Sequence, residues 1–340
     1  MSIFSGEVHR LSQNIKKTYE GDKPDGIGFL ISPEEANELL RQNPKNSDCI
    51  FPFLSGMDIN DHLNQEHDRF AICFHDWPLD KAMNYPELLK IVEERVKPHR
   101  NTIKRKRNRD RWWLYGEYRK GFRNAIEQKQ KVLVRAKVSE YHMMVFVPKG
   151  RILASQLTLF IFDDFANFAT LQSNIHETWL RRNAPTLESR QYYTTTDCFD
   201  TFPFPQNPRY YRENLLENTG EAFYEYRQMV MTNRQIGLTK FYTILNKPDC
   251  QDEDIIHIRN LQIDMDQAVL SRYGWDDIDL QHDFYPNDRK KIRFMPSPAA
   301  QREIFTRLVA LNQEIAAQEA AQGVVVEAGE EDEIDEETEA

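Results

Sequence analysis

The chain has 340 residues, 40% of them apolar, which is enough for one large domain or two modest ones with buried cores. The formal net charge is −10, but nine acidic residues and no basic ones lie between Glu327 and Glu339, so the rest of the chain is nearly neutral at −1. The four cysteines show no CxxC or zinc spacing, and no apolar run approaches the roughly 20 residues of a membrane span. These features predict a cytoplasmic protein without a metal site or membrane segment.

The first predicted elements follow a polar N-terminal segment. Residues 1–25 show little apolar periodicity and predict a linker or docking arm. Ser32-Pro33-Glu34-Glu35 predicts a helix start, because Ser caps, Pro suits the first helical position and Glu35 closes a capping box. Residues 70–74 predict a buried strand. Pro86 begins a helix that Pro98 bends or ends.

Three apolar stretches in the middle of the chain predict strands, over 132–138, 143–147 and 152–162. Asp164 is then placed to cap a helix with the apolar stripe Phe168, Leu171, Ile175 and Trp179. An aromatic, proline-rich segment over 192–208 ends this domain, which is predicted to cover 26–208.

Beyond about residue 209 the pattern becomes helical. Helices are predicted over 209–231, 233–246 and 252–273, the third ending at Gly274 as a C-cap, and a last one starts at Ser297. They predict a helical domain over 209–322. The acidic tail over 323–340 is predicted to be disordered. The fold class is therefore α+β, with a mixed-sheet domain followed by a helical domain.

A basic stretch is the clearest functional signal. Between Arg95 and Lys137 there are sixteen Lys or Arg and three acids, a local balance of +13. Lys and Arg that neutralise phosphates release counterions, which favours binding to a polyanion, and an Arg can also read a guanine edge. The predicted DNA-binding residues are Arg100, Lys104, Arg105, Lys106, Arg107, Arg109, Arg111, Arg181 and Arg182. The alternatives are a solvated face, a surface for acidic partners and, for the last two, favourable charge at a helix C-terminus.

Trp112 and Trp113 directly follow the basic stretch. They are candidates for stacking on a base. Core packing is the favoured alternative, because adjacent Trp residues usually bury at least one ring.

The remaining motifs predict no chemistry in this chain. Gly26-Ile-Gly28 lacks a preceding strand and a third glycine, which indicates a simple turn. Asn207-Pro208-Arg209-Tyr210 resembles the Asn-Pro-Pro-Tyr/Phe loop of DNA amino-methyltransferases, but an Arg replaces the second proline. His176 has no neighbouring ligand, and Glu127-Gln-Lys129 is only loosely similar to a nuclease site. We therefore predict no catalytic, cofactor-binding or metal-binding residue.

Several segments together resemble the C-terminal half of large single-chain DNA adenine methyltransferases, which occur in type IIG-like restriction–modification enzymes and phage-defence systems. The resemblance runs over about residues 20–318, and its segments are 26–36, 51–60, 70–77, 96–100, Trp112-Trp113, 171–179, 193–205 and 270–278.

The resemblance implies a target-recognition domain followed by a helical element, which select the DNA sequence. In that family an N-terminal half binds S-adenosylmethionine and methylates adenine N6. We therefore expect this chain to bind double-stranded DNA, to carry no cofactor and to work with a methyltransferase catalytic chain that binds S-adenosylmethionine. The alternatives are a fragment or subunit of an adenine-specific methyltransferase, and a regulatory interaction protein that does not bind DNA.

Overall fold

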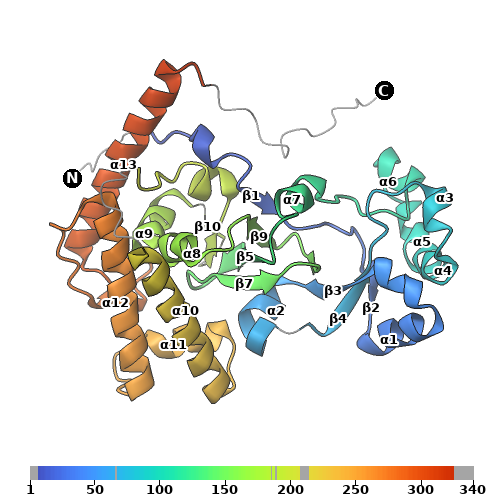
Figure 1. The fold of residues 1–340 in the computed structure, drawn as a ribbon, viewed down its shortest axis with the longest axis horizontal. Coiled ribbons are helices and arrows are strands. Elements are labelled where there is room, and N and C mark those ends of the chain that lie inside the picture. The colour runs from blue at the N-terminus through green and yellow to red at the C-terminus, as the bar shows by residue number, and fades with distance from the viewer. Residues whose placement is uncertain (1–6, 66, 185, 188–189, 207–213, 325–340) are drawn as a thin grey trace. The chain divides into compact units, whose positions relative to one another are not determined.

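The computed structural model describes residues 7–324, except 66, 185, 188–189 and 207–213 (Figure 1). The chain forms two compact units. The mixed-sheet unit comprises residues 19–136 and 145–161, and the helical unit comprises 1–18, 137–144 and 162–340. This division differs from the ranges 26–208 and 209–322 expected from the sequence. One reason is that β6 (Val138–Ser139) pairs with β11 (Arg190–Tyr192), so a short central segment belongs to the helical unit.

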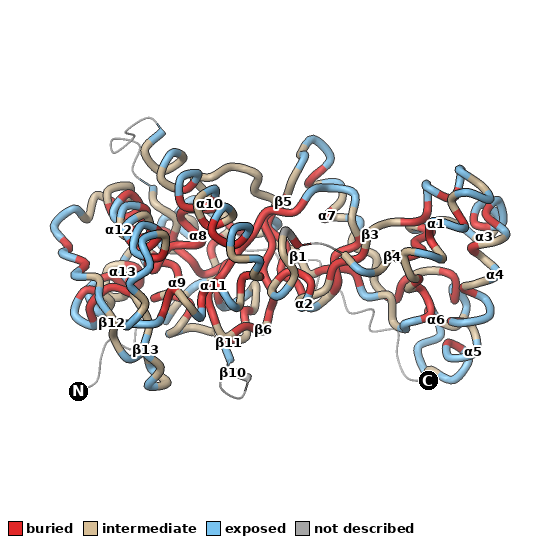
Figure 2. Tube along the Cα trace, turned by 90° about the horizontal axis from the view of Figure 1, so that it is seen from below, coloured by how far each residue is buried: buried red, intermediate tan, exposed pale blue. Residues whose placement is uncertain are grey.

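Two four-stranded sheets form the mixed-sheet unit. The first has the order β1 (Thr18–Glu20), β9 (Leu157–Phe160), β5 (Lys131–Ala136), β7 (Val145–Pro148), and β5 is antiparallel to both neighbours. The second has the order β2 (Leu30–Ile31), β4 (Arg69–Ile72), β3 (Ile50–Leu54), β8 (Ile152–Leu153). The β3–β8 pair is parallel and the others are antiparallel, so the predicted mixed sheet is confirmed. Most of β5 is buried (Figure 2).

Short helices complete the mixed-sheet unit: α1 (Pro33–Gln42), α2 (Gly56–Asp61), α3 (Leu79–Ala82), α4 (Pro86–Arg95), α5 (Lys97–Arg100), α6 (Lys106–Asp110) and α7 (Lys120–Ala125). The predicted capping box begins α1, where the Ser32 hydroxyl accepts from the Glu35 backbone N–H at 3.2 Å and the Glu35 carboxylate accepts from that of Ser32 at 3.1 Å. The core of this unit joins the strands to these helices through side chains such as Phe29, Ile72 and Leu88.

The helical unit contains α8 (Phe165–Gln172), α9 (Asn174–Asn183), α10 (Leu215–Arg234), α11 (Leu238–Leu245), α12 (Glu253–Tyr273) and α13 (Pro298–Ala321). Its core includes Trp179, Phe202 and Ile304, all fully buried. Small sheets accompany the helices: β10 (Thr186–Leu187) extends the β6–β11 pair, and β12 (Asp283–Pro286) forms a hairpin with β13 (Ile292–Met295). The hairpin was not expected in a region predicted to be helical.

Several predicted elements are altered by local breaks. The stretch 152–162 forms two short strands, β8 and β9, instead of one. The helix predicted from Asp164 is interrupted at Ser173, whose extended backbone ends α8 and whose hydroxyl accepts from the His176 N–H to begin α9. The predicted caps at Asp164 and Gly274 are confirmed, and the predicted last helix starts after Ser297, which caps it.

The described part of the N-terminal segment, for which a linker or docking arm is predicted, makes buried contacts within the two units. Leu11 is fully buried, and the Asn14 amide donates to the carbonyls of Phe199 and Phe202 within the helical unit. In the mixed-sheet unit, Asp22 pairs with Arg123 at 2.6 Å. Buried hydrogen bonds of this kind fix a chain segment in place.

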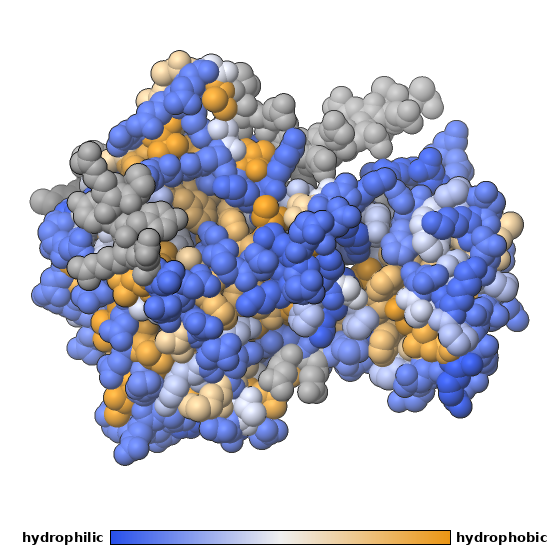
Figure 3. Space-filling model, viewed as in Figure 1, coloured by the Kyte–Doolittle hydropathy of each residue, from blue (hydrophilic) through white to orange (hydrophobic). Residues whose placement is uncertain are grey.

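Most of the apolar side chains lie inside the two units. Hydrophilic residues cover most of the surface in view in Figure 3. Within the described residues, no helix combines the length and apolarity needed to cross a bilayer. The acidic tail lies almost wholly outside the described residues.

Candidate nucleic-acid interface

Arg100 anchors the basic stretch from inside the mixed-sheet unit. Its side chain is fully buried, and its guanidinium donates to the carbonyls of Pro24 at 2.8 Å and Leu114 at 3.2 Å. Burial lowers the pKa of this group, an effect that Asp25, 3.9 Å away, opposes. A buried guanidinium cannot reach a phosphate, so the prediction that Arg100 contacts DNA is corrected: it is a structural residue.

The cations that follow Arg100 lie on the surface. The exposed residues of this cationic segment are Lys104, Arg105, Lys106, Arg107 and Arg111. They lie on α6 and the residues that flank it, while Asn108 points inward and is 5% exposed. The helix therefore turns a polar anchor toward the protein and positive charge toward solvent.

Arg109 is held differently from these neighbours. It is partly buried, and its Nη1 donates to the carbonyls of Ile103 at 2.8 Å and Lys104 at 2.5 Å. Its guanidinium thus closes the turn that precedes α6. Arg109 therefore lies beside the predicted interface, and its Nη1 already donates to these two carbonyls.

Trp112 and Trp113 pack in the core. They are 9% and 8% exposed, and the Trp113 indole donates to the Trp77 carbonyl at 2.9 Å. The Lys97 ammonium lies 4.7 Å from the Trp112 ring centre. The structure therefore agrees with core packing. The prediction that a DNA base stacks on either ring is corrected, because protein atoms cover both rings.

Arg181 and Arg182 belong to the other unit, at the end of α9. The Arg181 side chain is 9% exposed and pairs with Glu177 at 2.5 Å and Asp288 at 3.0 Å. Although burial alone lowers its pKa, the two carboxylates raise it above the ordinary value. Its charge is thus compensated within the protein, which removes it from the predicted phosphate contacts. Arg182 is exposed, and its guanidinium carbon lies 5.8 Å from the centre of the Phe305 ring.

The charge of the two units differs in sign. In the sequence of the mixed-sheet unit, Lys and Arg outnumber Asp and Glu by four, although the whole chain carries −10. The part of the basic stretch that lies in this unit, from Arg95 to Arg135, has fifteen Lys or Arg and three acids and accounts for this excess. The positive charge is therefore concentrated in the mixed-sheet unit, which is the pattern that attracts a polyanion.

Sequence reasoning missed one feature next to the cationic segment. The turn Asp25-Gly26-Ile27 is tied to α6, because Asn108 Nδ2 donates to the Asp25 carboxylate at 3.1 Å. Ile27 on this turn is 87% exposed. The two glycines predict a simple turn, and the structure has a short 3-10 helix over Ile27–Phe29 directly after Gly26. Nothing in the local sequence indicated that this segment packs against a helix about eighty residues later.

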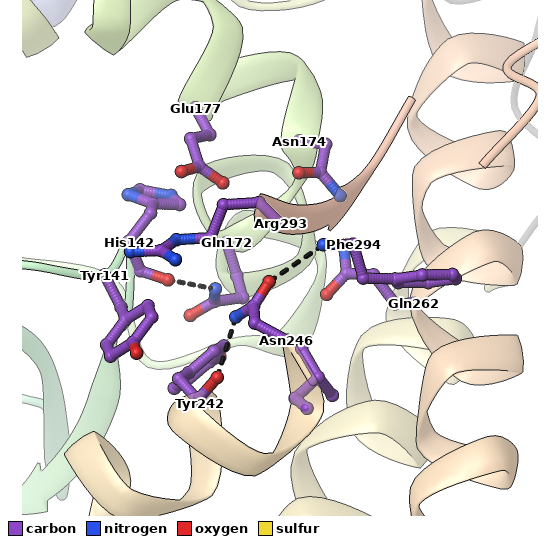
Figure 4. A pocket seen from close by; sticks show the side chains of 11 residues that line it. Tyr141, His142, Gln172, Asn174, Glu177, Tyr242, Asn246, Gln262, Arg293 and Phe294 are labelled. Carbon is purple, nitrogen blue, oxygen red and sulfur yellow. Dashed lines mark hydrogen bonds between the residues drawn. The ribbon is translucent and has the colours of Figure 1, made fainter. Parts of the chain in front are cut away.

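A small polar pocket lies in the helical unit (Figure 4). Hydrogen bonds already use much of its lining: Asn246 donates to the Tyr242 carbonyl at 2.7 Å and accepts from the Phe294 N–H at 2.8 Å. Its free volume is about 30 Å³, the space of one water molecule. In this conformation it admits neither a nucleobase nor a cofactor.

A larger cavity of about 400 Å³ lies in the same unit, between the N-terminal segment, α8 and the starts and ends of neighbouring helices. Burial lowers the pKa of Lys17 on its wall. Its described lining has no carboxylate, histidine or cysteine, and so no group of the kinds that most often act as general bases.

One group among the described residues has the composition of a metal site. Ligand atoms of Asp58, His62 and Asp68 lie within 4.8 Å of one another. Asp58, however, accepts from the Ser55 N–H and hydroxyl, both at 2.6 Å, and from Arg69 at 3.2 Å. These bonds make the carboxylate part of the capping box that begins α2, with Ser55 as the N-cap. The Asn207–Tyr210 motif lies outside the described residues.

The fold and this surface define a mixed α/β protein with a cationic segment displayed on its strand-rich unit. The model of the family described as "MmeI, target recognition domain" matches residues 3–206, more than half of the chain. The chain belongs to this family. The match includes the whole mixed-sheet unit and the first part of the helical unit.

A solved structure supports the same fold. The chain is similar to the Type IIL restriction–modification enzyme MmeI, solved in complex with DNA, with 18% sequence identity and a TM-score of 0.65. The similarity covers 93% of this chain and 37% of the MmeI chain, so this chain spans well under half of that protein. No curated protein matches the chain.

Proposed function

We propose that this chain recognises a DNA sequence as the specificity part of a restriction–modification enzyme. The observation that carries the proposal is the cationic segment on the unit that the target-recognition family model covers completely. The MmeI structure, whose fold the chain shares, was solved with DNA. Exposed Lys and Arg side chains neutralise phosphates and fix the register of a protein on the duplex, while nearby loops read the base edges.

The positions of the charged groups indicate which residues contact phosphates and which parts of the chain read bases. Lys104, Arg105 and Lys106 extend into solvent at the start of α6, whose inner side is anchored by Asn108. Such side chains supply affinity without sequence information. The bases must therefore be read by groups on neighbouring loops, and these need not be charged.

We further propose the finer assignments that the sequence resemblance implies. The target base is adenine, and the methyl transfer takes place on a separate catalytic chain that binds S-adenosylmethionine. The system serves phage defence in the cytoplasm. These proposals rest on the matching segments and concern an assembly of which this chain is one part.

The salt dependence of DNA binding tests the main proposal. The logarithm of the binding constant should fall steeply with the logarithm of salt concentration for the unmodified chain. Changing Lys104, Arg105, Lys106 and Arg107 together to Ala should make this slope shallower by up to about 0.9 for each phosphate that is no longer neutralised. Fluorescence anisotropy of a labelled duplex measures the slope.

A matched variant controls for total charge. Arg41, Lys90, Lys240 and Arg302 all lie on the surface, and none belongs to the cationic segment. Changing these four to Ala removes the same number of Lys and Arg residues and should leave the slope near that of the unmodified chain. If both quadruple variants changed the slope equally, the cationic segment would have no special role. If the unmodified chain ignored DNA at low ionic strength, DNA recognition itself would be wrong.

A further inference from the structure

Ile27 is the most exposed large apolar side chain among the described residues, at 87%. Single exposed apolar residues are common on protein surfaces, so exposure alone means little. What distinguishes Ile27 is how firmly its backbone is held. A chain that fixes an apolar side chain in solvent forgoes the stabilisation that burying it elsewhere would bring.

The segment before Ile27 is tied down at successive residues within the mixed-sheet unit. Lys23 exchanges two backbone hydrogen bonds with Glu117, at 3.0 and 3.1 Å. The Pro24 carbonyl accepts from the buried Arg100 guanidinium, and the Asp25 carboxylate accepts from Asn108. The turn is thus fixed at several points of the basic stretch.

The backbone of the turn itself has an unusual conformation. Asp25 has a φ of +55° and Gly26 a φ of +143°, which residues other than glycine rarely adopt. On the other side of Ile27, a Cβ on Gly28 would lie only 2.7 Å from the Arg95 carbonyl oxygen, so the chain passes directly against α4. Ile27 therefore projects from a turn that is clamped before and after it.

We propose that Ile27 enters a groove of bound DNA and makes an apolar contact with the bases. The proposal rests on the proposed function and deepens it. DNA is the occupant that the surroundings favour, because the turn is bonded to α6, whose outward side chains are the exposed cations that we assign to phosphates. An isoleucine offers no donor or acceptor, so it senses thymine methyl groups and shape, which phosphate contacts cannot do.

Phosphate contacts and a base contact predict different measurements. Removal of a cation makes the salt slope shallower and weakens binding to all sequences similarly. Removal of the Ile27 side chain should leave the slope unchanged, because no ion is released at an apolar contact. It should instead reduce the preference for one base pair of the target, by roughly tenfold.

The experiment selects bound duplexes from a randomised library and sequences them, using the full chain and its Ile27→Ala variant. Met57→Ala is the matched control, because Met57 is 57% exposed in the same unit but lies on α2, which packs near β5. A second variant, Gly26→Ala, keeps Ile27 but strains the turn, and no atom lies within 4 Å of the added Cβ. It should weaken the same preference as Ile27→Ala, whereas Met57→Ala should not.

The outcomes separate this inference from the proposed function. An unmodified chain that fails to bind any duplex contradicts DNA recognition. If the chain binds with a steep salt slope but Ile27→Ala selects the same sequences with the same strength, the base contact is wrong. It is also wrong if Ile27→Ala weakens binding to all sequences equally. The same holds if the variant leaves the selected sequences unchanged and reduces only the binding of a protein partner. Thermal melting confirms that the variants remain folded.

Discussion

Arg100 and Arg105 lie five positions apart in the same basic stretch but have opposite surroundings. Arg105 is exposed, whereas the Arg100 guanidinium is buried against the carbonyls of Pro24 and Leu114. Composition treats the two residues as equal. Tertiary contacts make Arg100 part of the folded interior, whereas Arg105 remains accessible to a ligand.

Replacing Arg100 with Ala should therefore lower stability. The change removes two hydrogen bonds from a charged group and leaves a cavity, which typically costs about 2–5 kcal/mol. Urea unfolding measures the destabilisation, and Arg105→Ala is the control, expected within about 0.5 kcal/mol of the unmodified chain. A folded Arg100→Ala protein should keep the salt slope of DNA binding. Unchanged stability with a shallower slope would return Arg100 to the interface.

The sequence predicted the kinds of residues in the candidate site better than their exposure. The basic stretch and the turn at residues 26–28 were both identified. Burial of Arg100 and pairing of Arg181 with Asp288 depend on segments far away in the sequence, so no local pattern indicated them. The exposure of Ile27 could not be predicted from the local sequence either, because an isoleucine beside a strand normally predicts a core position.

At the scale of elements, the caps were the most predictable features. Ser32, Asp164 and Ser297 each cap a helix through a hydroxyl or carboxylate, a bond formed within three residues. Interruptions were less predictable: the apolar stripe from Phe168 to Trp179 keeps helical spacing across the break at Ser173. The spacing of apolar residues indicates which face of a helix is buried, but it says little about where the helix breaks and the chain changes direction.

Gly220 shows a helix contact that depends on one residue. It lies in α10 where that helix packs on α8, and a Cβ there would come within 2.3 Å of the Phe165 carbonyl oxygen. Gly220→Ala should destabilise the protein by about 1–3 kcal/mol through overpacking, although Ala normally favours a helix over Gly. Thermal or urea unfolding measures this. Glu221→Ala, at the exposed neighbouring position, should have little effect, and a stabilised Gly220→Ala variant would contradict this packing.

At the scale of the whole molecule, the order of segments conceals the division into units. Residues 137–144 belong to the helical unit although both flanking strands, β5 and β7, pair in the mixed-sheet unit. The sequence pattern predicts the domain boundary near residue 209, because the composition changes there. The α+β class is confirmed, while the interleaving of the two units required the tertiary pairing of β6 with β11.

The proposed separation of recognition from methyl transfer makes a prediction about the assembly. The chain alone should not methylate DNA, and a complex with its catalytic chain should transfer a methyl group from S-adenosylmethionine to adenine N6. Co-purification followed by a tritium-methyl assay on genomic DNA measures both. The variant lacking the four cations from Lys104 to Arg107 should still co-purify but methylate less at physiological salt, because phosphate contacts supply much of the affinity. Methylation by the isolated chain would contradict the separation. Unchanged methylation by the variant complex would instead show that the catalytic chain holds the DNA without this surface.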